Sequence, residues 1–240
     1  MTITNSTGKI YFIPVTLGES EDPKNVLANS VFEVVDKLNE FIVENEKTAR
    51  RFIKLICPSK IQSNLKIHIL NKHTQPEDQY NYIKTALEGG EIGLMSEAGV
   101  PGIADPGADI ARLAHSENIN VVPLVGPSSI LMAMMASGMN GQSFAFNGYL
   151  PIDKFEKKKA LKEYEKRSLS LNQSQIFIET PYRNNKLIEE LINTLNPTTD
   201  LCIAADISLK TEFIKTLPIS KWKKYKIDLH KRPCIFIIQK

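Results

Sequence analysis

SEAGVPGIADPG, residues 96–107, directly follows the short apolar run EIGLM at residues 91–95. These twelve residues hold three glycines, two prolines and two acids. Glycine lacks a Cβ atom and proline fixes φ, so a strand that ends in such a loop lets the backbone approach a ligand closely. We expect the active site here. A tight strand-to-helix connection, with glycines that serve turn geometry alone, is the alternative.

Around this loop, short apolar runs alternate with segments of helical periodicity. This alternation predicts an α/β fold, in which helices cover parallel or mixed sheets. The expected strands are 9–15, 40–44, 66–70, 91–95, 119–124, 144–149, 175–179, 200–206, 212–216 and 233–239. The expected helices are 25–38, 46–56, 77–88, 107–117, 127–138, 155–170, 182–195 and 219–225. The helix expected at 127–138 carries a methionine stripe, which we expect to lie in the core.

Ten strands are too many for one ordinary sheet. The segment VPLVGPSS at residues 122–129 packs prolines and a glycine between an apolar strand and the methionine-rich helix. Such a cluster is typical of a domain boundary. We therefore expect two α/β domains, residues 1–123 and 124–240.

Composition excludes several classes of protein. Thirty basic and twenty-seven acidic side chains give a net charge of only +3, short of the strongly basic surface of a dedicated nucleic-acid binder. The chain has three cysteines, an odd number, and their spacing is not that of metal ligands: Cys57, Cys202 and Cys234. We therefore expect buried thiols and no metal site. Without a leader-like N-terminus or a membrane-length apolar run, the chain is expected to be a soluble cytoplasmic protein.

Three further motifs lie at predicted strand ends or helix starts. Ser128 and Ser129 open a helix, where hydroxyl residues either cap the helix or face a polar ligand. The turn PVTLG at residues 14–18 ends the first strand, at the edge where open α/β sheets bind ligands. ETPYR at 179–183 sets an acid, an aromatic and an arginine after another strand, and a helix-capping turn explains it equally well. Neither dinucleotide nor P-loop fingerprints occur.

Taken in order along the chain, SEAGVPGIADPG, VVPLVGPSS and FIETPYR resemble the tetrapyrrole-methylase superfamily of S-adenosylmethionine-dependent methyltransferases. The chain is most similar to the branch that methylates a ribose 2′-hydroxyl of small-subunit ribosomal RNA. The resemblance covers residues 9 to 239. It implies two α/β domains with the methyl donor in the cleft between them, in a homodimer. By position, the implied donor contacts are Pro14, Ala98, Gly99, Val100, Ile103, Ser128, Ser129, Ile178 and Glu179.

The chain departs from this branch at several positions. Glu97 stands in place of Asp, Val100 in place of Thr, Asn45-Glu46-Lys47 in place of Asp-Thr-Arg, and Tyr182 in place of His. A helical extension that follows the last strand in the branch is also absent. These departures affect the expected substrate more than the expected donor.

Methyl transfer from a sulfonium needs mainly positioning, with a base if the acceptor is a poorly acidic hydroxyl. The candidate bases follow apolar strands: Glu44, Glu97 and Glu179, of which Glu97 is preferred. Asp105 is expected to cap the helix that follows it. Two alternatives remain open, a small-molecule methyltransferase of the tetrapyrrole type and a non-catalytic donor-binding module.

Basic side chains in two expected helices suit contacts with RNA phosphates. They are Arg50, Arg51 and Lys54 in the first helix and Lys157, Lys158, Lys159 and Lys162 in the second. Arg183 is a further candidate for contact with the substrate. Solvated helix faces explain such charges equally well.

Overall fold

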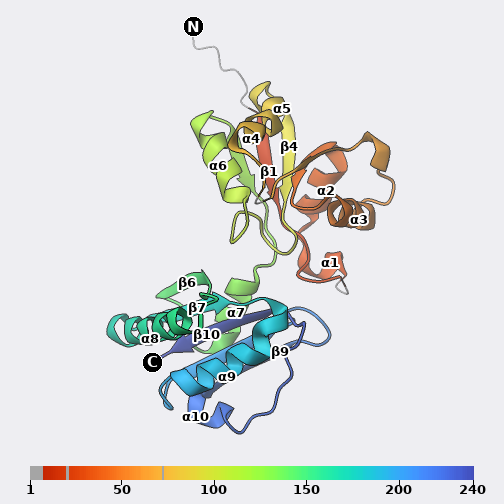
Figure 1. Ribbon diagram of the computed structural model, residues 1–240. Coiled ribbons are helices and arrows are strands. Elements are labelled where there is room, and N and C mark those ends of the chain that lie inside the picture. Colours follow the sequence, from red (N-terminus) through yellow and green to blue (C-terminus); the bar gives the residue numbers. More distant parts are fainter. Residues whose placement is uncertain (1–7, 20–21, 72) are drawn as a thin grey trace. The chain divides into compact units, whose positions relative to one another are not determined.

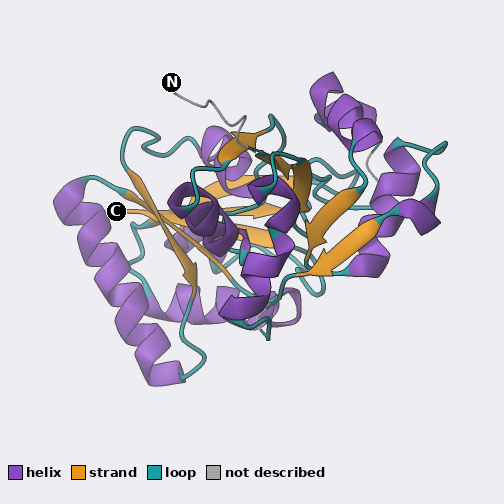
Figure 2. Ribbon diagram, turned by 90° about the horizontal axis from the view of Figure 1, so that it is seen from above, coloured by secondary structure: helices purple, strands orange, loops and turns teal. Residues whose placement is uncertain are grey.

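The computed structural model describes residues 8–19, 22–71 and 73–240, and it divides into two compact units between Ser128 and Ser129. We call them the N-terminal unit and the C-terminal unit. The sequence analysis placed its boundary a few residues earlier, between residues 123 and 124. Strands and helices alternate through both units (Figures 1 and 2).

The N-terminal unit is built on a five-stranded parallel sheet with the strand order β3-β2-β4-β1-β5. Its strands are β1 (Lys9–Ile13), β2 (Glu40–Val43), β3 (Lys66–Ile69), β4 (Glu91–Met95) and β5 (Asn120–Pro123). Its helices are α1 (Pro23–Val26), α2 (Asn29–Lys37), α3 (Glu46–Ile56), α4 (Pro76–Tyr82), α5 (Lys84–Leu87) and α6 (Gly107–Ser116), with the 3₁₀ turn η1 at Gln62–Asn64. Because all five strands are parallel, the loops after β1, β2 and β4 meet at one edge of the sheet.

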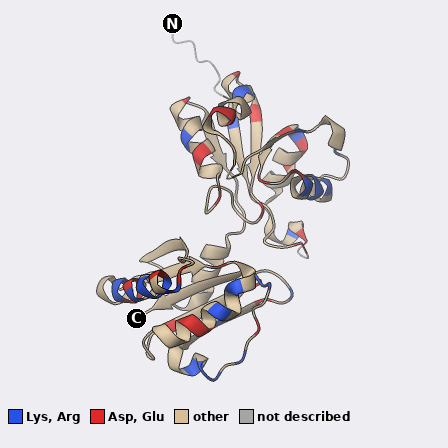
Figure 3. Ribbon diagram, viewed as in Figure 1, with Lys and Arg blue, Asp and Glu red and all other residues tan. Residues whose placement is uncertain are grey.

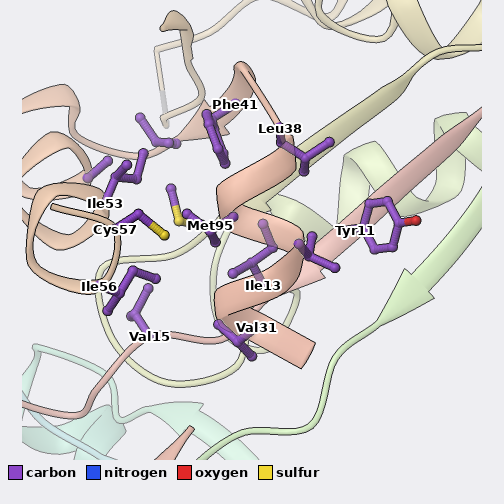
Figure 4. Close-up of a cluster of buried hydrophobic side chains, with 14 of the residues drawn as sticks. Tyr11, Ile13, Val15, Val31, Leu38, Phe41, Ile53, Ile56, Cys57 and Met95 are labelled. Atoms are coloured by element: carbon purple, nitrogen blue, oxygen red, sulfur yellow. The ribbon is translucent and has the colours of Figure 1, made fainter. Parts of the chain in front are cut away.

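Helices cover both faces of this sheet, as a buried parallel sheet requires (Figure 1). On one face, side chains of β1 and β2 pack with α2 and α3 around Ile13, Phe41 and Ile53, which are fully buried (Figure 4). On the other face, Ile92 of β4 packs with α5 and with Ile110 of α6. The two cores fix the strands, and so fix where the loops at the sheet edge begin.

The C-terminal unit holds a mixed sheet with the order β6-β7-β10-β8-β9, in which only β6 and β7 run parallel. Its strands are β6 (Phe144–Tyr149), β7 (Ser174–Ile178), β8 (Asp200–Ala205), β9 (Phe213–Pro218) and β10 (Cys234–Gln239). Its helices are α7 (Ser129–Ser137), α8 (Lys154–Leu171), α9 (Asn184–Thr194) and α10 (Ile219–Trp222), with the 3₁₀ turn η2 at Pro181–Arg183. Phe177, Phe236 and Trp222 anchor its core with side chains of α8 and α9.

The expected strands and helical segments are confirmed, and so is their separation into two sheets. Two expected helices, 25–38 and 77–88, are each broken into a pair of shorter helices. The expectation of a methionine stripe in the core is wrong for Met135, which is 84% exposed, whereas Met134 is buried. α7 is apolar on all sides, so periodicity could not indicate which methionine faces the sheet.

The three cysteines are unpaired and buried, as expected. Burial raises the pKa of the Cys234 thiol to about 12, which keeps it protonated and unreactive. No helix in the described part of the chain is both long and apolar enough to cross a membrane. Residues 1–7, on which the expectation about the N-terminus rests, lie outside the described residues.

Candidate functional site

Three segments from distant parts of the sequence meet at the carboxyl edge of the N-terminal sheet. The amide of Val15, just past β1, donates a hydrogen bond to the carbonyl of Gly99 at 3.0 Å. A Cβ atom on Gly99 would lie 3.0 Å from both Leu17 Cδ2 and the carbonyl oxygen of Pro127. The motifs at residues 14–18, 96–107 and 126–127 are therefore neighbours.

Gly99 is required here by the fold of the loop itself. Its φ of +70° is a conformation that residues with a Cβ rarely adopt, and the space beside it is occupied by Leu17 and Pro127. The sequence analysis gave a different reason, the close approach of a ligand to the backbone. Ala98 is exposed and Ile103 is 53% exposed, so both side chains are accessible, as are those of Glu97 and Ala104 in the same loop.

Asp105 organises the second half of the loop. Its carboxylate accepts hydrogen bonds from the amides of Gly102 at 2.9 Å and Gly107 at 2.7 Å. Gly107 is the first residue of α6, so Asp105 satisfies a free amide at the helix start, as expected, although from the position before the N-cap. Burial raises the pKa of Asp105, against the effect of these backbone hydrogen bonds.

Two of the candidate bases lie together at this edge. Glu97 Oε1 accepts a hydrogen bond from the Thr48 hydroxyl at 2.5 Å, and the Glu97 amide donates to Glu44 Oε1 at 3.1 Å. Burial raises the pKa of Glu44, and the charges of Asp105 and Glu97 raise it further. Glu97 itself is exposed and held by Thr48, so a substrate hydroxyl can reach its carboxylate.

A pocket of about 370 Å³ opens beside Glu97, within the size range of small-ligand sites. We call it the α3 pocket, because one wall is a face of α3 and the other is formed by the ends of β1 and β4. Its lining residues are Val15, Thr16, Leu17, Gly18, Glu19, Thr48, Ala49, Arg51, Phe52, Leu55, Met95, Ser96 and Glu97.

The sequence analysis missed Thr48, Phe52 and Leu55 as functional candidates. With Arg51 they fall at positions i, i+3, i+4 and i+7 of α3, the spacing of one helical face. That spacing was available in the sequence, but only the charged residues of this helix were considered there.

The remaining expected donor contacts belong to the C-terminal unit, apart from Ser128. Ser129 is the first residue of α7, and Ile178 is the last residue of β7. Glu179 is buried: its Oε1 accepts from the Thr180 amide at 2.7 Å, and its carboxylate lies 3.7 Å from both Lys157 and Arg183. The Glu179 carboxylate is buried beside two cations, which disfavours it as a base, and its backbone stays a predicted donor contact.

The candidate phosphate ligands divide into accessible and occupied groups. Arg50 donates to Glu46 at 2.7 Å and to the carbonyl of Gln62 at 2.5 Å, so its guanidinium is used to tie α3 to η1. Lys157 is buried, with Glu190 at 3.0 Å. Lys157 is therefore not a solvated cation, whereas contact of the part-exposed Arg50 with phosphate stays a prediction. Arg51 and Arg183 are accessible; both remain substrate candidates.

Basic residues gather along α3 and α8 (Figure 3). Of the candidate phosphate ligands on α8, Lys158, Lys159 and Lys162 are exposed. Lys54 of α3 is exposed and donates to the carbonyl of Pro58. Within the described residues, no three histidine, cysteine, aspartate or glutamate side chains are grouped so as to hold a metal ion.

No protein-family model matches the sequence. The chain is 30% identical over 209 residues to ribosomal RNA small subunit methyltransferase I of Bacillus subtilis, which covers 87% of this chain and 67% of the relative. The protein of the same name from Vibrio cholerae is 26% identical, over 92% of this chain and 72% of the relative. The one from Buchnera aphidicola (Schizaphis graminum) is 29% identical, over 99% of this chain and 80% of the relative.

Solved structures show the same fold. The crystal structure of the methyltransferase CobJ aligns with a TM-score of 0.64 at 13% identity, over 97% of this chain and 94% of that chain. Uroporphyrin III C-methyl transferase from Thermus thermophilus aligns with a TM-score of 0.59 at 14% identity, over 97% and 98%. The tetrapyrrole-methylase fold implied by the sequence motifs is thereby confirmed.

Proposed function

Because this chain belongs to the family of ribosomal RNA small subunit methyltransferase I, we propose that it transfers a methyl group from S-adenosylmethionine to a ribose 2′-hydroxyl of small-subunit ribosomal RNA. The observation that supports the proposal most is the convergence of residues 14–18, 96–107 and 126–127 at one sheet edge, beside a carboxylate. S-adenosylmethionine supplies an activated methyl group on a sulfonium, so the protein needs chiefly to orient donor and acceptor.

The residues of the loop fit such a donor. Ala98 is exposed and Val100 half-buried, both with small side chains, and Ile103 adds exposed apolar surface, whereas Pro14 is buried just past β1. Asp105 and the Gly99–Val15 hydrogen bond hold this loop in one conformation, so little ordering is left to occur on binding. With Ser128, Ser129, Ile178 and Glu179, these residues are the proposed donor contacts.

Glu97 accepts the proton that leaves the ribose hydroxyl when the new O–CH₃ bond forms. The hydrogen bond from Thr48 fixes the rotamer of its carboxylate, and the second oxygen remains for the acceptor. A general base typically contributes 10²- to 10⁴-fold to rate. Glu97→Gln should therefore lower kcat about 100-fold or more, with donor affinity unchanged. Glu88→Gln, an exposed change on the same unit, is the matched control.

Methyl-labelled donor tests the proposal directly. The purified chain is incubated with it and with small-subunit ribosomal RNA, free or in subunits, and separately with uroporphyrinogen III. A 2′-O-methyl group blocks alkaline cleavage of the neighbouring phosphodiester, so the label should appear in alkali-resistant dinucleotides. Label in mononucleotides would indicate base methylation, and label in the tetrapyrrole would indicate a small-molecule enzyme. Donor binding without transfer to any acceptor would indicate a binding module.

We also propose that the chain works in the cytoplasm as a homodimer. Large apolar side chains exposed on the C-terminal unit support an association: Met135 is 84% exposed, Ile152 78% and Phe155 72%. Light scattering on the purified chain should give twice the mass of one chain, 27.0 kDa. A monomer at micromolar concentration would contradict this part of the proposal.

A further inference from the structure

The α3 pocket includes Ser96 and Glu97, the first two residues of the 96–107 loop, but none of the proposed donor contacts. Its lining ends at Glu97, and the adjoining residue Ala98 is the first proposed donor contact of the loop. A molecule in this pocket would therefore sit against the same carboxylate that the reaction requires. This places the pocket where the methyl acceptor must be.

The apolar part of the lining favours a flat, partly apolar ligand. Phe52, Leu55 and Leu17 contribute to the pocket, and Leu55 is 55% exposed. Aromatic side chains in such pockets are the usual platforms on which unstacked nucleobases lie. Phe52 is the aromatic residue among the residues that line this pocket.

The polar part of the lining matches the rest of a nucleotide. Thr48 and Glu97 offer a hydroxyl and a carboxylate joined by a 2.5 Å hydrogen bond, which suits a ribose hydroxyl. Arg51 offers a guanidinium, which suits a phosphate. It pairs with Glu19, but both side chains are well exposed, at 58% and 78%, and such pairs are weak. A phosphate can therefore replace Glu19 at little cost.

We propose that the α3 pocket binds a single nucleotide of the RNA, flipped out of its stack, with the base against Phe52, the phosphate at Arg51 and the ribose at Glu97. This inference rests on the proposed function and names the acceptor subsite for it. Extrusion explains how one hydroxyl of a structured RNA reaches a carboxylate at a sheet edge. Phe52 and Arg51 are then positioning residues for the acceptor, and neither serves the donor.

Variants of the two residues test the proposal by kinetics. Loss of one base–aromatic contact is expected to raise the KM for RNA about tenfold in Phe52→Leu, whereas Phe52→Tyr keeps the platform and should stay within about twofold. Arg51→Gln should also raise that KM about tenfold. Arg112→Gln removes the same charge from α6, where the side chain is 82% exposed, and should behave as the parent.

Two readouts separate acceptor binding from a loss of structure. Donor affinity by calorimetry should be unchanged in all four variants, and the midpoint of thermal unfolding should fall only in Phe52→Leu, because Phe52 also packs against the N-terminal core. If Phe52→Leu and Phe52→Tyr have the same KM, or if Arg51→Gln matches Arg112→Gln, the proposed subsite is wrong. The parent enzyme's methylation of RNA is unaffected by that result, so the proposed function would survive.

A binding measurement tests the pocket even if the protein methylates no RNA. The four nucleoside 5′-monophosphates are titrated into the ¹⁵N-labelled full chain, and amide shifts are expected at residues 48–55 and 96–97. These shifts in a protein that methylates no RNA would overturn the proposed function and leave the pocket's ligand class in place. Shifts confined to other residues would show that the α3 pocket is not the nucleotide site.

Discussion

At the scale of single residues, Ala98 and Gly99 are adjacent in the loop but differ in what they do. Gly99 has φ +70° and no room for a Cβ atom, whereas Ala98 is exposed. Ala98→Trp should therefore weaken binding of S-adenosylmethionine about tenfold or more, since a clash worth 1.4 kcal/mol already costs that factor. Calorimetry measures the affinity, and the thermal midpoint should stay that of the parent.

Gly99→Arg should lose donor binding for a different reason. A side chain there strains the backbone and overlaps Leu17 and Pro127, so we expect a loss of about 2 kcal/mol or more in unfolding free energy. Chemical denaturation of both variants distinguishes the two residues. Normal donor binding by Ala98→Trp would place the donor away from this loop.

Lys157 is buried, although its position in a run of three lysines suggests a solvent-exposed side chain. Its ammonium, 7% exposed, lies between the carboxylates of Glu179 and Glu190. Among the described residues neither Glu179 Oε2 nor Glu190 Oε2 accepts a hydrogen bond. Lys157→Ala should cost about 3 kcal/mol, because the half-buried Glu190 loses its counterion and the buried Glu179 keeps only Arg183. The exposed neighbour Lys158→Ala should cost less than about 0.5 kcal/mol in the same denaturation experiment.

At the scale of elements, Glu40 joins β2 to β3 and to α5. It accepts hydrogen bonds from His68 and Thr85, each at 2.7 Å, and pairs with Lys66 at 2.8 Å. Burial alone would raise the pKa of Glu40, but these hydrogen bonds together outweigh it and lower the pKa. A lowered pKa in the folded state means that the ionised carboxylate stabilises the fold.

Glu40→Gln should therefore lower the unfolding free energy at pH 7 by about 2 kcal/mol. The contribution of Glu40 is complete above the ordinary pKa of a glutamate, about 4.3, and is lost as pH falls through the lowered value. Denaturation measured from pH 7 to pH 3 should show the parent and the variant converging below about pH 4.3. A gap that stays constant with pH would show that the charge of Glu40 is not its cause.

The pKa shifts of Glu44 and Asp105 are opposite in sign to that of Glu40, because burial raises the pKa of both. Their ionised forms cost stability at neutral pH, and both lie at the sheet edge that holds the candidate site. Carboxylates placed at such a cost are typical of functional sites.

The sequence predicted the elements well because most core helices and strands have one dominant period, with the uniformly apolar α7 an exception. It predicted the site less well, since contacts between elements are not periodic. Arg50 and Arg51 are alike in sequence, yet one ties α3 to η1 and the other lines a pocket. Helical spacing alone identifies the face shared by Thr48, Arg51 and Phe52, but only the fold shows that this face meets Glu97.

At the scale of the whole molecule, the net charge of +3 leaves RNA affinity to local clusters of basic side chains. One such cluster is on α8, whose Lys158, Lys159 and Lys162 are exposed. Next to it, a groove of about 430 Å³ between α8 and α9 is lined by four lysines: Lys154, Lys157, Lys158 and Lys186. Lys157 is neutralised by its glutamates, so the exposed lysines are the ones that can meet phosphates.

If the substrate is RNA, binding must weaken steeply as salt rises, since each phosphate neutralised releases counterions. Changing Lys158, Lys159 and Lys162 to Gln should lower the slope of log affinity against log salt by roughly two, at about 0.7 per contact. Changing Lys223, Lys224 and Lys226 to Gln alters the net charge equally and should leave the slope nearly unchanged. Filter binding between about 50 and 300 mM salt measures both slopes. Equal reductions would mean that α8 acts only through net charge, and a parent protein with no salt dependence would favour a small-molecule acceptor.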